Sequence, residues 1–250
     1  MDIFDMLQDV DEAPEARQIR IIKPRMDPLN FYSDNDFYKR FRMTKHSARF
    51  LIELVGDELE TQRLPGSFKV LSALHMMAAG CMQSTTGNLM GISQSCQSKT
   101  LHTFLDALLP HRRNIVRFPD DLIAVKRAFN ELSGMPNIIG AVDGTHVHIK
   151  KPSGVPNPEI YYNRKSQTSI NTQVVAGTDL RFYNVVARWA GSTHDSRIFR
   201  SCTLFNRIET EDLRGKSYPF GDKGYPSLPF MLTPIRENCL HSPEDRAYNR

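Results

Sequence analysis

The spacing of hydrophobic residues changes once along the chain, at Ser133-Gly134-Met135-Pro136, and this change limits the possible folds more than any other feature. Before it, apolar residues recur at intervals of three and four, which is typical of amphipathic helices. After it, residues 137–150 alternate as a strand does, with one face made of Ile139, Ala141, Asp143, Thr145, Val147 and Ile149. The sequence therefore predicts a helical first part and a second part built around β-strands.

The first part is predicted to hold an irregular acidic tail over residues 1–30 and an all-helical region over residues 31–118. Within that region, apolar residues at helical spacing predict helices over residues 70–82 and 93–109, and Gly91 lies in the connection between them. Two helices joined by a short, glycine-containing connection are typical of a helix-turn-helix unit.

The last helix of this unit carries polar residues that are candidates for contact with DNA. We expect Gln94, Gln97 and Lys99 on its exposed side, where they could reach base edges or phosphates. A polar face is also the normal property of any surface helix, so an ordinary helical bundle is an equally open interpretation. A surface that binds a partner protein is a third.

The second part, residues 119–250, is predicted to be an α/β domain with a mixed sheet. The third strand precedes a helix, and a helical crossover allows the fourth strand to run parallel to an earlier one. Helices then cover the sheet. The expected elements are strands over 137–150, 169–177, 182–190 and 218–220, and a helix over 194–213.

Three aspartates lie at or near the ends of these predicted strands. Asp143 interrupts an apolar strand, and an unpaired carboxylate buried there would cost several kcal/mol, which favours a functional role over an acid that is satisfied by Thr145, a histidine or a lysine. Asp222 follows the fourth strand between two glycines, and a simple turn explains it equally well. Asp195 lies between the third strand and the next helix, where capping of that helix is the simpler explanation.

Taken together, the three aspartates predict a metal site. Strand ends on one side of a mixed sheet converge, so Asp143 and Asp222 are expected to share a site. Clustered carboxylates repel one another, and a divalent cation neutralises them. Ligands that are all oxygens favour Mg²⁺ or Mn²⁺. Two such ions would activate a water molecule and stabilise the leaving oxygen of a phosphodiester.

The distribution of charge favours an anionic partner. The formal net charge is +4, but residues 1–15 hold six acids and no base, so the remainder of the chain has 32 Lys and Arg against 22 acids, or +10. Lys150, Arg164 and Lys165 are the candidate phosphate-binding residues near the predicted acids. Basic side chains on a solvated face are the alternative for each of them taken singly.

Several classes of protein are excluded by the sequence. No segment approaches the roughly 18 consecutive apolar residues of a membrane helix. The acidic N-terminus is unlike a secretory signal. The four cysteines are scattered and form no CxxC pair, which argues against a disulfide framework and against a cysteine zinc site. We therefore expect a reducing compartment and no membrane contact.

Five motifs occur in an order that resembles a known family. They are AVDGTHV at 141–147, YNRK at 162–165, GSTHDS at 191–196, GDKGYP at 221–226 and MLTP at 231–234. Together they closely resemble the DDE-superfamily endonuclease domain of Harbinger transposases, and the resemblance extends over roughly residues 31–250.

This resemblance implies a ribonuclease-H-like fold, dependence on a divalent metal, and cleavage of DNA phosphodiester bonds. It also implies a nuclear location, with the cytoplasm as a second one, and it allows a separate DNA-binding partner protein. By position, Asp143 corresponds to the first metal-binding acid of the family, and Asp195 and Asp222 correspond to two further acids. Fold logic favours Asp222 as the principal second acid, because it follows the fourth strand.

One departure from the family pattern concerns the end of the chain. The family has a glutamate on a helix beyond its Tyr-Asn element, which here is Tyr248-Asn249, next to the last residue. We therefore expect a C-terminally truncated member that lacks this acid and a covering helix. The primary hypothesis is a transposase-derived, metal-dependent endonuclease, with strand transfer left open. The alternative is a catalytically impaired module that binds DNA or a protein.

Overall fold

The computed structural model describes residues 25–209, 217–235, 239 and 242, and its contacts divide the chain into two compact units, Met1–His111 and Arg112–Arg250. Most of the expected acidic tail lies outside the described residues. The division falls before the expected boundary at residue 118 because Phe118 packs into the core of the second unit. In the described residues, no helix combines the length and the apolar composition needed to cross a membrane.

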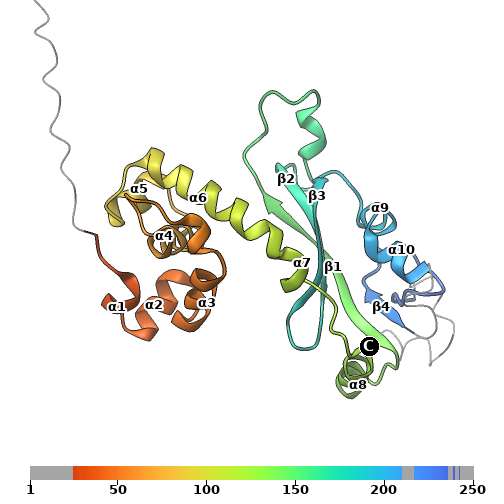
Figure 1. Ribbon diagram of the computed structural model, residues 1–250. Coiled ribbons are helices and arrows are strands. Elements are labelled where there is room, and N and C mark those ends of the chain that lie inside the picture. The colour runs from red at the N-terminus through yellow and green to blue at the C-terminus, as the bar shows by residue number, and fades with distance from the viewer. Residues whose placement is uncertain (1–24, 210–216, 236–238, 240–241, 243–250) are drawn as a thin grey trace, which may run out of the picture. The chain divides into compact units, whose positions relative to one another are not determined.

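The first unit is helical, as the spacing of its apolar residues predicts (Figure 1). Ser33, Thr44 and Ser93 each accept a hydrogen bond from a backbone N–H of the helix that follows, so polar caps define three of the helix starts. The α-helices are α1 (Pro28–Phe31), α2 (Asp34–Phe41), α3 (Lys45–Val55), α4 (Gly66–Ala79), α5 (Gln83–Leu89) and α6 (Gln94–Leu108).

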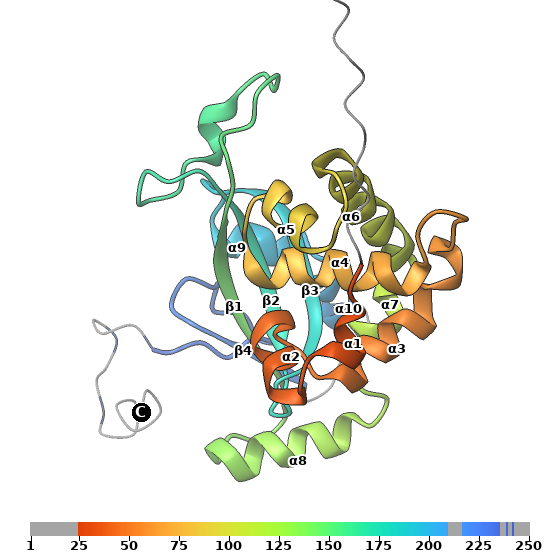
Figure 2. The same cartoon turned by 90° about the vertical axis from the view of Figure 1, so that its left-hand side faces the viewer.

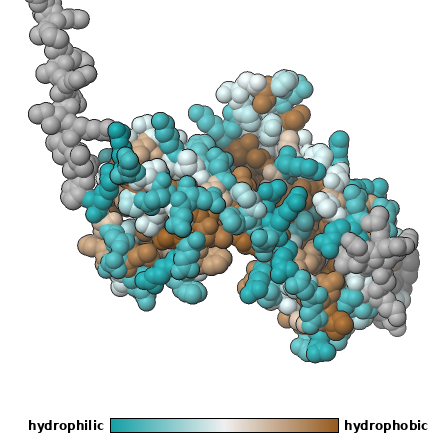
Figure 3. All heavy atoms as spheres, in the orientation of Figure 1, coloured by the Kyte–Doolittle hydropathy of each residue, from teal (hydrophilic) through white to brown (hydrophobic). Residues whose placement is uncertain are grey.

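The helices α4, α5 and α6 occupy the segment for which the sequence predicts a helix-turn-helix unit. A β-carbon at Gly87 of α5 would lie 2.8 Å from the carbonyl oxygen of Ile92, so only glycine allows this close approach of the turn to α5. Gly91 has a φ of 68°, a left-handed conformation that glycine adopts without strain. Hydrophilic and hydrophobic residues are interspersed on the face of this unit seen in Figure 3.

The second unit is a four-stranded mixed sheet with helices, and it confirms the predicted α/β fold class. The strand order is β3-β2-β1-β4; β1, β2 and β3 pair antiparallel, and β4 pairs parallel to β1 as the crossover argument predicts. The strands are β1 (Ile138–His148), β2 (Ser169–Ala176), β3 (Phe182–Ala190) and β4 (Tyr218–Gly221), and the α-helices are α7 (Arg112–Ile115), α8 (Leu122–Ser133), α9 (Asp195–Arg200) and α10 (Thr203–Glu209).

The expected single helix over 194–213 is two short helices in the described residues. α9 ends at Arg200, the chain turns at Ser201 and Cys202, and α10 begins at Thr203. Cys202 is buried, and its sulfur accepts a hydrogen bond from the backbone N–H of Phe205, so the turn packs into the core.

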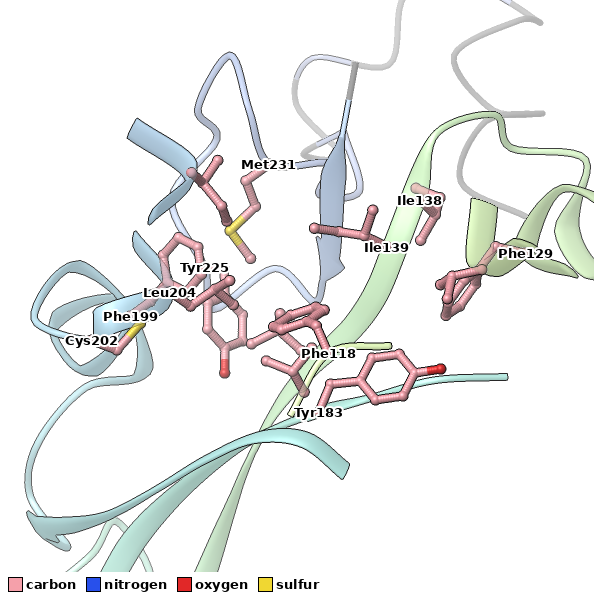
Figure 4. Packing of buried hydrophobic residues seen from close by; sticks show 14 residues of the cluster. Phe118, Phe129, Ile138, Ile139, Tyr183, Phe199, Cys202, Leu204, Tyr225 and Met231 are labelled. Atoms are coloured by element: carbon pink, nitrogen blue, oxygen red, sulfur yellow. The ribbon is translucent and has the colours of Figure 1, made fainter. Parts of the chain in front are cut away.

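The core of the second unit lies around the first half of β1, between α8 and the short helices α9 and α10 (Figure 4). Phe199 contacts both Phe205 and Tyr225 edge to face, with ring centroids 5.7 and 5.8 Å apart. The second half of β1 leaves this core, and the segment between β1 and β2, with the short 3-10 helix Pro158–Tyr161, projects beyond the sheet (Figures 1 and 2).

Candidate metal and nucleic-acid site

Asp143 lies where β1 leaves the core. Residues 138–140 and Val142 are buried, whereas Asp143 is exposed. The expectation of a buried carboxylate is therefore wrong: its apolar neighbours belong to the covered half of the strand, and the acid is the first residue beyond it. Oδ1 of Asp143 accepts a hydrogen bond of 2.7 Å from the backbone N–H of Gly144.

Asp222 follows β4 and lies beside Asp143 at the same end of the sheet. Val142 pairs with Gly221 in the parallel β1–β4 ladder, so the next residue of each strand is one of the two acids. Oδ1 of Asp222 accepts a hydrogen bond of 2.9 Å from the backbone N–H of Gly224, which is the turn contact that the alternative interpretation predicts. The turn geometry and the position beside Asp143 are compatible.

Asp195 is the first residue of α9 and does not cap it, because the N-cap position belongs to His194. Its Oδ1 accepts a hydrogen bond of 2.8 Å from Nδ2 of Asn171 on β2. A β-carbon at Gly144 would lie 2.6 Å from this same oxygen. The carboxylate of Asp195 therefore lies over the backbone of β1, at the residue next to Asp143.

Two glycines leave the space in which these carboxylates converge. Besides the contact at Gly144, a β-carbon at Gly224 would lie 3.0 Å from Oδ1 of Asp222 and 3.6 Å from Oδ2 of Asp195. Gly144 and Gly224 thus form a cradle that larger residues would fill. The sequence motifs place Gly144 directly after Asp143 and Gly224 two residues after Asp222, and the structure supplies the reason.

Tyr225 is a buried side chain on which the negative charges of all three acids act. Its side chain is 4% exposed, and its hydroxyl has no hydrogen-bond partner among the described residues. Burial raises the pKa of this hydroxyl strongly, and the negative charges of Asp195, Asp143 and Asp222 raise it further. The three carboxylates are therefore within electrostatic range of a single buried side chain.

The donor chemistry of this cradle fits a hard divalent cation, because its ligands are carboxylate oxygens in a space kept open by glycines. Each Oδ1 accepts a hydrogen bond, whereas in the described part of the chain no protein group donates to the three Oδ2 atoms. The described residues hold no group of three His, Cys, Asp or Glu close enough together to bind a metal. Asp195 and Asp222 approach each other at Gly224, and Asp143 lies beside Asp222 at the end of the β1–β4 ladder.

A cleft of about 460 Å³ adjoins Asp195, and basic and polar side chains line it. Nη2 of Arg164 lies 3.0 Å from Nε2 of His194; a guanidinium has no acceptor, so Arg164 donates and His194 accepts. Oδ1 of Asn163 accepts from the backbone N–H groups of Lys165 and Gln167, which fixes the turn that carries both cations. The lining includes His146, Asn163, Arg164, Lys165, His194 and Asp195.

The other sequence-predicted residues have different positions. Lys150 is exposed just beyond β1 and is not among the lining residues of the cleft. Gln94 and Lys99 are exposed on α6, as expected. Gln97 is fully buried, so the expectation that it lies on the exposed side is wrong. It shares the buried side of α6 with Thr100 and Phe104, at intervals of three and four.

Sequence reasoning missed two residues of the site, Asn171 and His194. Both contact a predicted residue: Asn171 bonds to Asp195, and His194 bonds to Arg164. A signal for Asn171 was present, because an amide within a strand that is largely buried needs a specific partner. His194 lies inside the GSTHDS motif but was not singled out from it.

Comparison with known proteins places these features in context. Residues 142–250 match the family described as DDE superfamily endonuclease. The chain is 34% identical over 230 residues to "Putative nuclease HARBI1" of Rattus norvegicus, an alignment covering 89% of this chain and 64% of that protein. It is 29% identical over 249 residues to "Protein ALP1-like" of Arabidopsis thaliana, covering 90% of this chain and 59% of that protein.

A third relative is "Putative nuclease HARBI1" of Homo sapiens, which is 32% identical over 230 residues, covering 89% of this chain and 64% of that protein. This chain thus spans about three fifths of the length of these relatives. No solved structure matches it.

Proposed function

Residues 142–250 carry a DDE superfamily endonuclease domain in a chain homologous over most of its length to Harbinger transposase-derived nucleases, and from this premise we propose a divalent-metal-dependent nuclease that hydrolyses DNA phosphodiester bonds. The observation that carries the proposal is the convergence of Asp195 and Asp222 beside Asp143 in the glycine cradle. We expect this activity in the nucleus, with the cytoplasm as the second location.

Asp195 and Asp222 would supply carboxylate ligands to Mg²⁺ or Mn²⁺, with Asp143 beside them as the third candidate ligand. Such an ion, when bound, supplies Lewis-acid chemistry to a phosphodiester and lowers the pKa of water. The chain's own contribution is geometric: the backbone N–H groups of Gly144 and Gly224 and the amide of Asn171 each hold one Oδ1 in place. The second oxygen of each carboxylate is thereby oriented before any ligand arrives.

The cleft beside Asp195 is the proposed binding site for the DNA backbone. Arg164 and Lys165 come from one fixed turn, and both line the same cleft as Asp195. A guanidinium binds phosphate in a planar, two-point manner. His194 accepts from Arg164 and orients it without neutralising its charge. Lys150, exposed just beyond the C-terminal end of β1 and outside the cleft lining, would add a further positive charge.

The proposal is tested by incubating the purified chain with supercoiled plasmid DNA in Mg²⁺ or Mn²⁺. We expect nicking that disappears on chelation and in Asp143→Asn and Asp222→Asn. The matched control is Asp120→Asn, an exposed acid of the same unit that pairs with Arg117 at 2.8 Å. Nicking that survives Asp143→Asn, or that Asp120→Asn removes equally, would contradict the proposal.

The second candidate is a module that binds DNA or a protein without cleavage, and the exposed Gln94 and Lys99 on α6 favour it. It predicts DNA binding that needs no divalent ion and weakens with salt. Lys99→Ala is expected to weaken binding uniformly across sequences and to reduce the salt slope by about one, as measured by fluorescence anisotropy. Ser95→Ala, on the same exposed turn, is the uncharged control.

A further inference from the structure

The side chain of Asn171 lies on the face of β2 that meets α9. Residues two apart on a strand share a face, and Val175 on that face belongs to the core that includes Phe199 of α9. Asn171 is 2% exposed. An amide at such a position is costly unless its polar atoms are bonded, so its partners indicate why it is there.

Both N–H groups of the Asn171 amide are used. Nδ2 lies 2.9 Å from the carbonyl oxygen of Thr193 and 2.8 Å from Oδ1 of Asp195. Both neighbours are oxygen acceptors, one a backbone carbonyl and the other a carboxylate. A flipped amide would bring its own oxygen against two other oxygens. The orientation of Asn171 is therefore fixed by the groups that it holds.

These two bonds determine the direction of Asp195. The bond to the Thr193 carbonyl anchors the connection between β3 and α9, and the bond to Oδ1 stops the carboxylate from rotating on it. Oδ2 then faces Gly224 and the carboxylate of Asp222. Without the amide, Oδ1 would keep no donor among the described residues, and the carboxylate could turn away from Asp222.

We propose that Asn171 is a positioning residue, which fixes the carboxylate of Asp195 so that its free oxygen converges with Asp222 on a divalent cation. This inference rests on the proposed metal-dependent function. The role of Asn171 is indirect, because its Nδ2 is fully engaged and its Oδ1 is buried.

Asn184 on β3 provides a matched control. It pairs with Val175, so it lies on the same face of the sheet, and its Oδ1 is also buried. In the described residues it makes no hydrogen bond to an aspartate. Replacing either asparagine by alanine removes an amide with a buried oxygen from the same sheet face, but only Asn171→Ala removes a bond to Asp195.

The experiment measures Mn²⁺ binding directly, by the electron paramagnetic resonance signal of free Mn²⁺ in titrations of the metal-free chain. Asn171→Ala is expected to weaken Mn²⁺ affinity by about 10- to 100-fold. Asn184→Ala is expected to stay within about twofold of the wild type, because it touches no ligand. Thermal melting of all variants identifies any that fail to fold.

A double-mutant cycle separates positioning from general support of the fold. In an Asp195→Ala background, Asn171→Ala should cause no further loss of Mn²⁺ affinity, whereas a purely structural role would weaken binding in both backgrounds. In nicking assays, excess Mn²⁺ should restore the rate of Asn171→Ala, and its KM for DNA should remain unchanged.

The outcomes distinguish this inference from the proposed function. If the wild type binds Mn²⁺ and Asn171→Ala binds it as tightly as Asn184→Ala does, the positioning role is overturned and the metal site stands. An equal loss of affinity in the Asp195→Ala background overturns it as well. A wild-type chain that neither binds Mn²⁺ nor nicks DNA overturns both proposals.

Discussion

Gln97 in the helical unit and Asn171 in the α/β unit are both buried amides, but their hydrogen bonds reach different kinds of groups. Gln97 bonds to the side chain and the backbone carbonyl of Ser72, so it links α6 to α4 within the helical core. Asn171 bonds to the carboxylate of Asp195, which lies in the cradle of acids. The amide of Gln97 joins two helices, and the amide of Asn171 connects the buried face of the sheet to the carboxylate of Asp195.

The same contrast holds for the buried polar atoms that lack a protein partner. Among the described residues, the helical unit contributes one, Nδ1 of His75. The others belong to the α/β unit, and they include the hydroxyl of Tyr225 and both amide atoms of Gln173. Buried polar groups in native proteins are normally satisfied, and two of these exceptions, Oδ1 of Asn171 and the hydroxyl of Tyr225, belong to residues near the acids.

Among the changes that test this comparison, the largest effect is expected from Gly144→Ala. It tests whether the glycine cradle makes the α/β unit, unlike the helical unit, a functional site. A β-carbon there would lie 2.6 Å from Oδ1 of Asp195, which Asn171 prevents from moving freely. Displacing a catalytic group by about 1 Å can cost about 100-fold in rate, and we expect a loss of that size in plasmid nicking.

Gly224→Ala serves as the graded control for this prediction. Its β-carbon would meet the acids at 3.0 and 3.6 Å, so a smaller loss of nicking is expected. Equal activity of Gly144→Ala and the wild type would show that Asp195 does not need its place over β1. The carboxylates near Gly144 would then be ordinary surface charges without a fixed arrangement.

Much of the α/β unit could be predicted from the sequence, because alternation of side chains reports directly on a two-faced sheet. The parallel pairing of β4 with β1 followed from the helical crossover. Asp143 was expected to be buried, and this was wrong, because apolar neighbours do not show where a strand leaves its cover. The role of Asn171 could not be predicted, since Asp195 is 24 residues away and only folding brings the two together.

The helical unit shows a different limit of the sequence. Gln97 was assigned to the exposed side because its side chain is polar, but its place on the helix aligns it with Phe104. The polar side chain predicts exposure, whereas the position on the helix predicts burial, and Gln97 is buried. A buried glutamine was accommodated because Ser72 on α4 supplies both a hydroxyl and a carbonyl.

A moderate effect is expected from Gln97→Leu, which tests whether this amide is structural. The change leaves the hydroxyl of Ser72 without its partner in the core, which costs about 1–3 kcal/mol of unfolding free energy. Urea denaturation should show this loss, and nicking at a temperature where the chain is folded should not change. Gln94→Ala, an exposed change on the same helix, should stay within about 0.5 kcal/mol.

Adding Ser72→Ala to Gln97→Leu should recover part of the stability, because replacing both polar partners by apolar groups removes the unsatisfied atom. If Gln97→Leu leaves stability unchanged but weakens DNA binding, the comparison between the two units fails. Gln97 would then act as an interface residue in spite of its burial.

The smallest effect concerns His75, the one described residue of the helical unit with an unpartnered buried polar atom. Burial lowers the pKa of its imidazole from the ordinary value of 6.5, and the positive charge of Arg40 lowers it further. The folded state therefore binds fewer protons than the unfolded state does. Stability should decline as the pH falls through 6.5 and level off below the folded pKa.

Urea midpoints between pH 7.5 and pH 5 measure this decline, and His75→Phe should flatten it because phenylalanine does not titrate. The substitution keeps an aromatic ring beside Phe41, whose centroid lies 5.5 Å from that of His75. A wild-type chain that gains stability over this range would show that protonated His75 finds a partner. The core of the helical unit would then stabilise a protonated histidine. Charged groups with specific partners would in that case occur in both units.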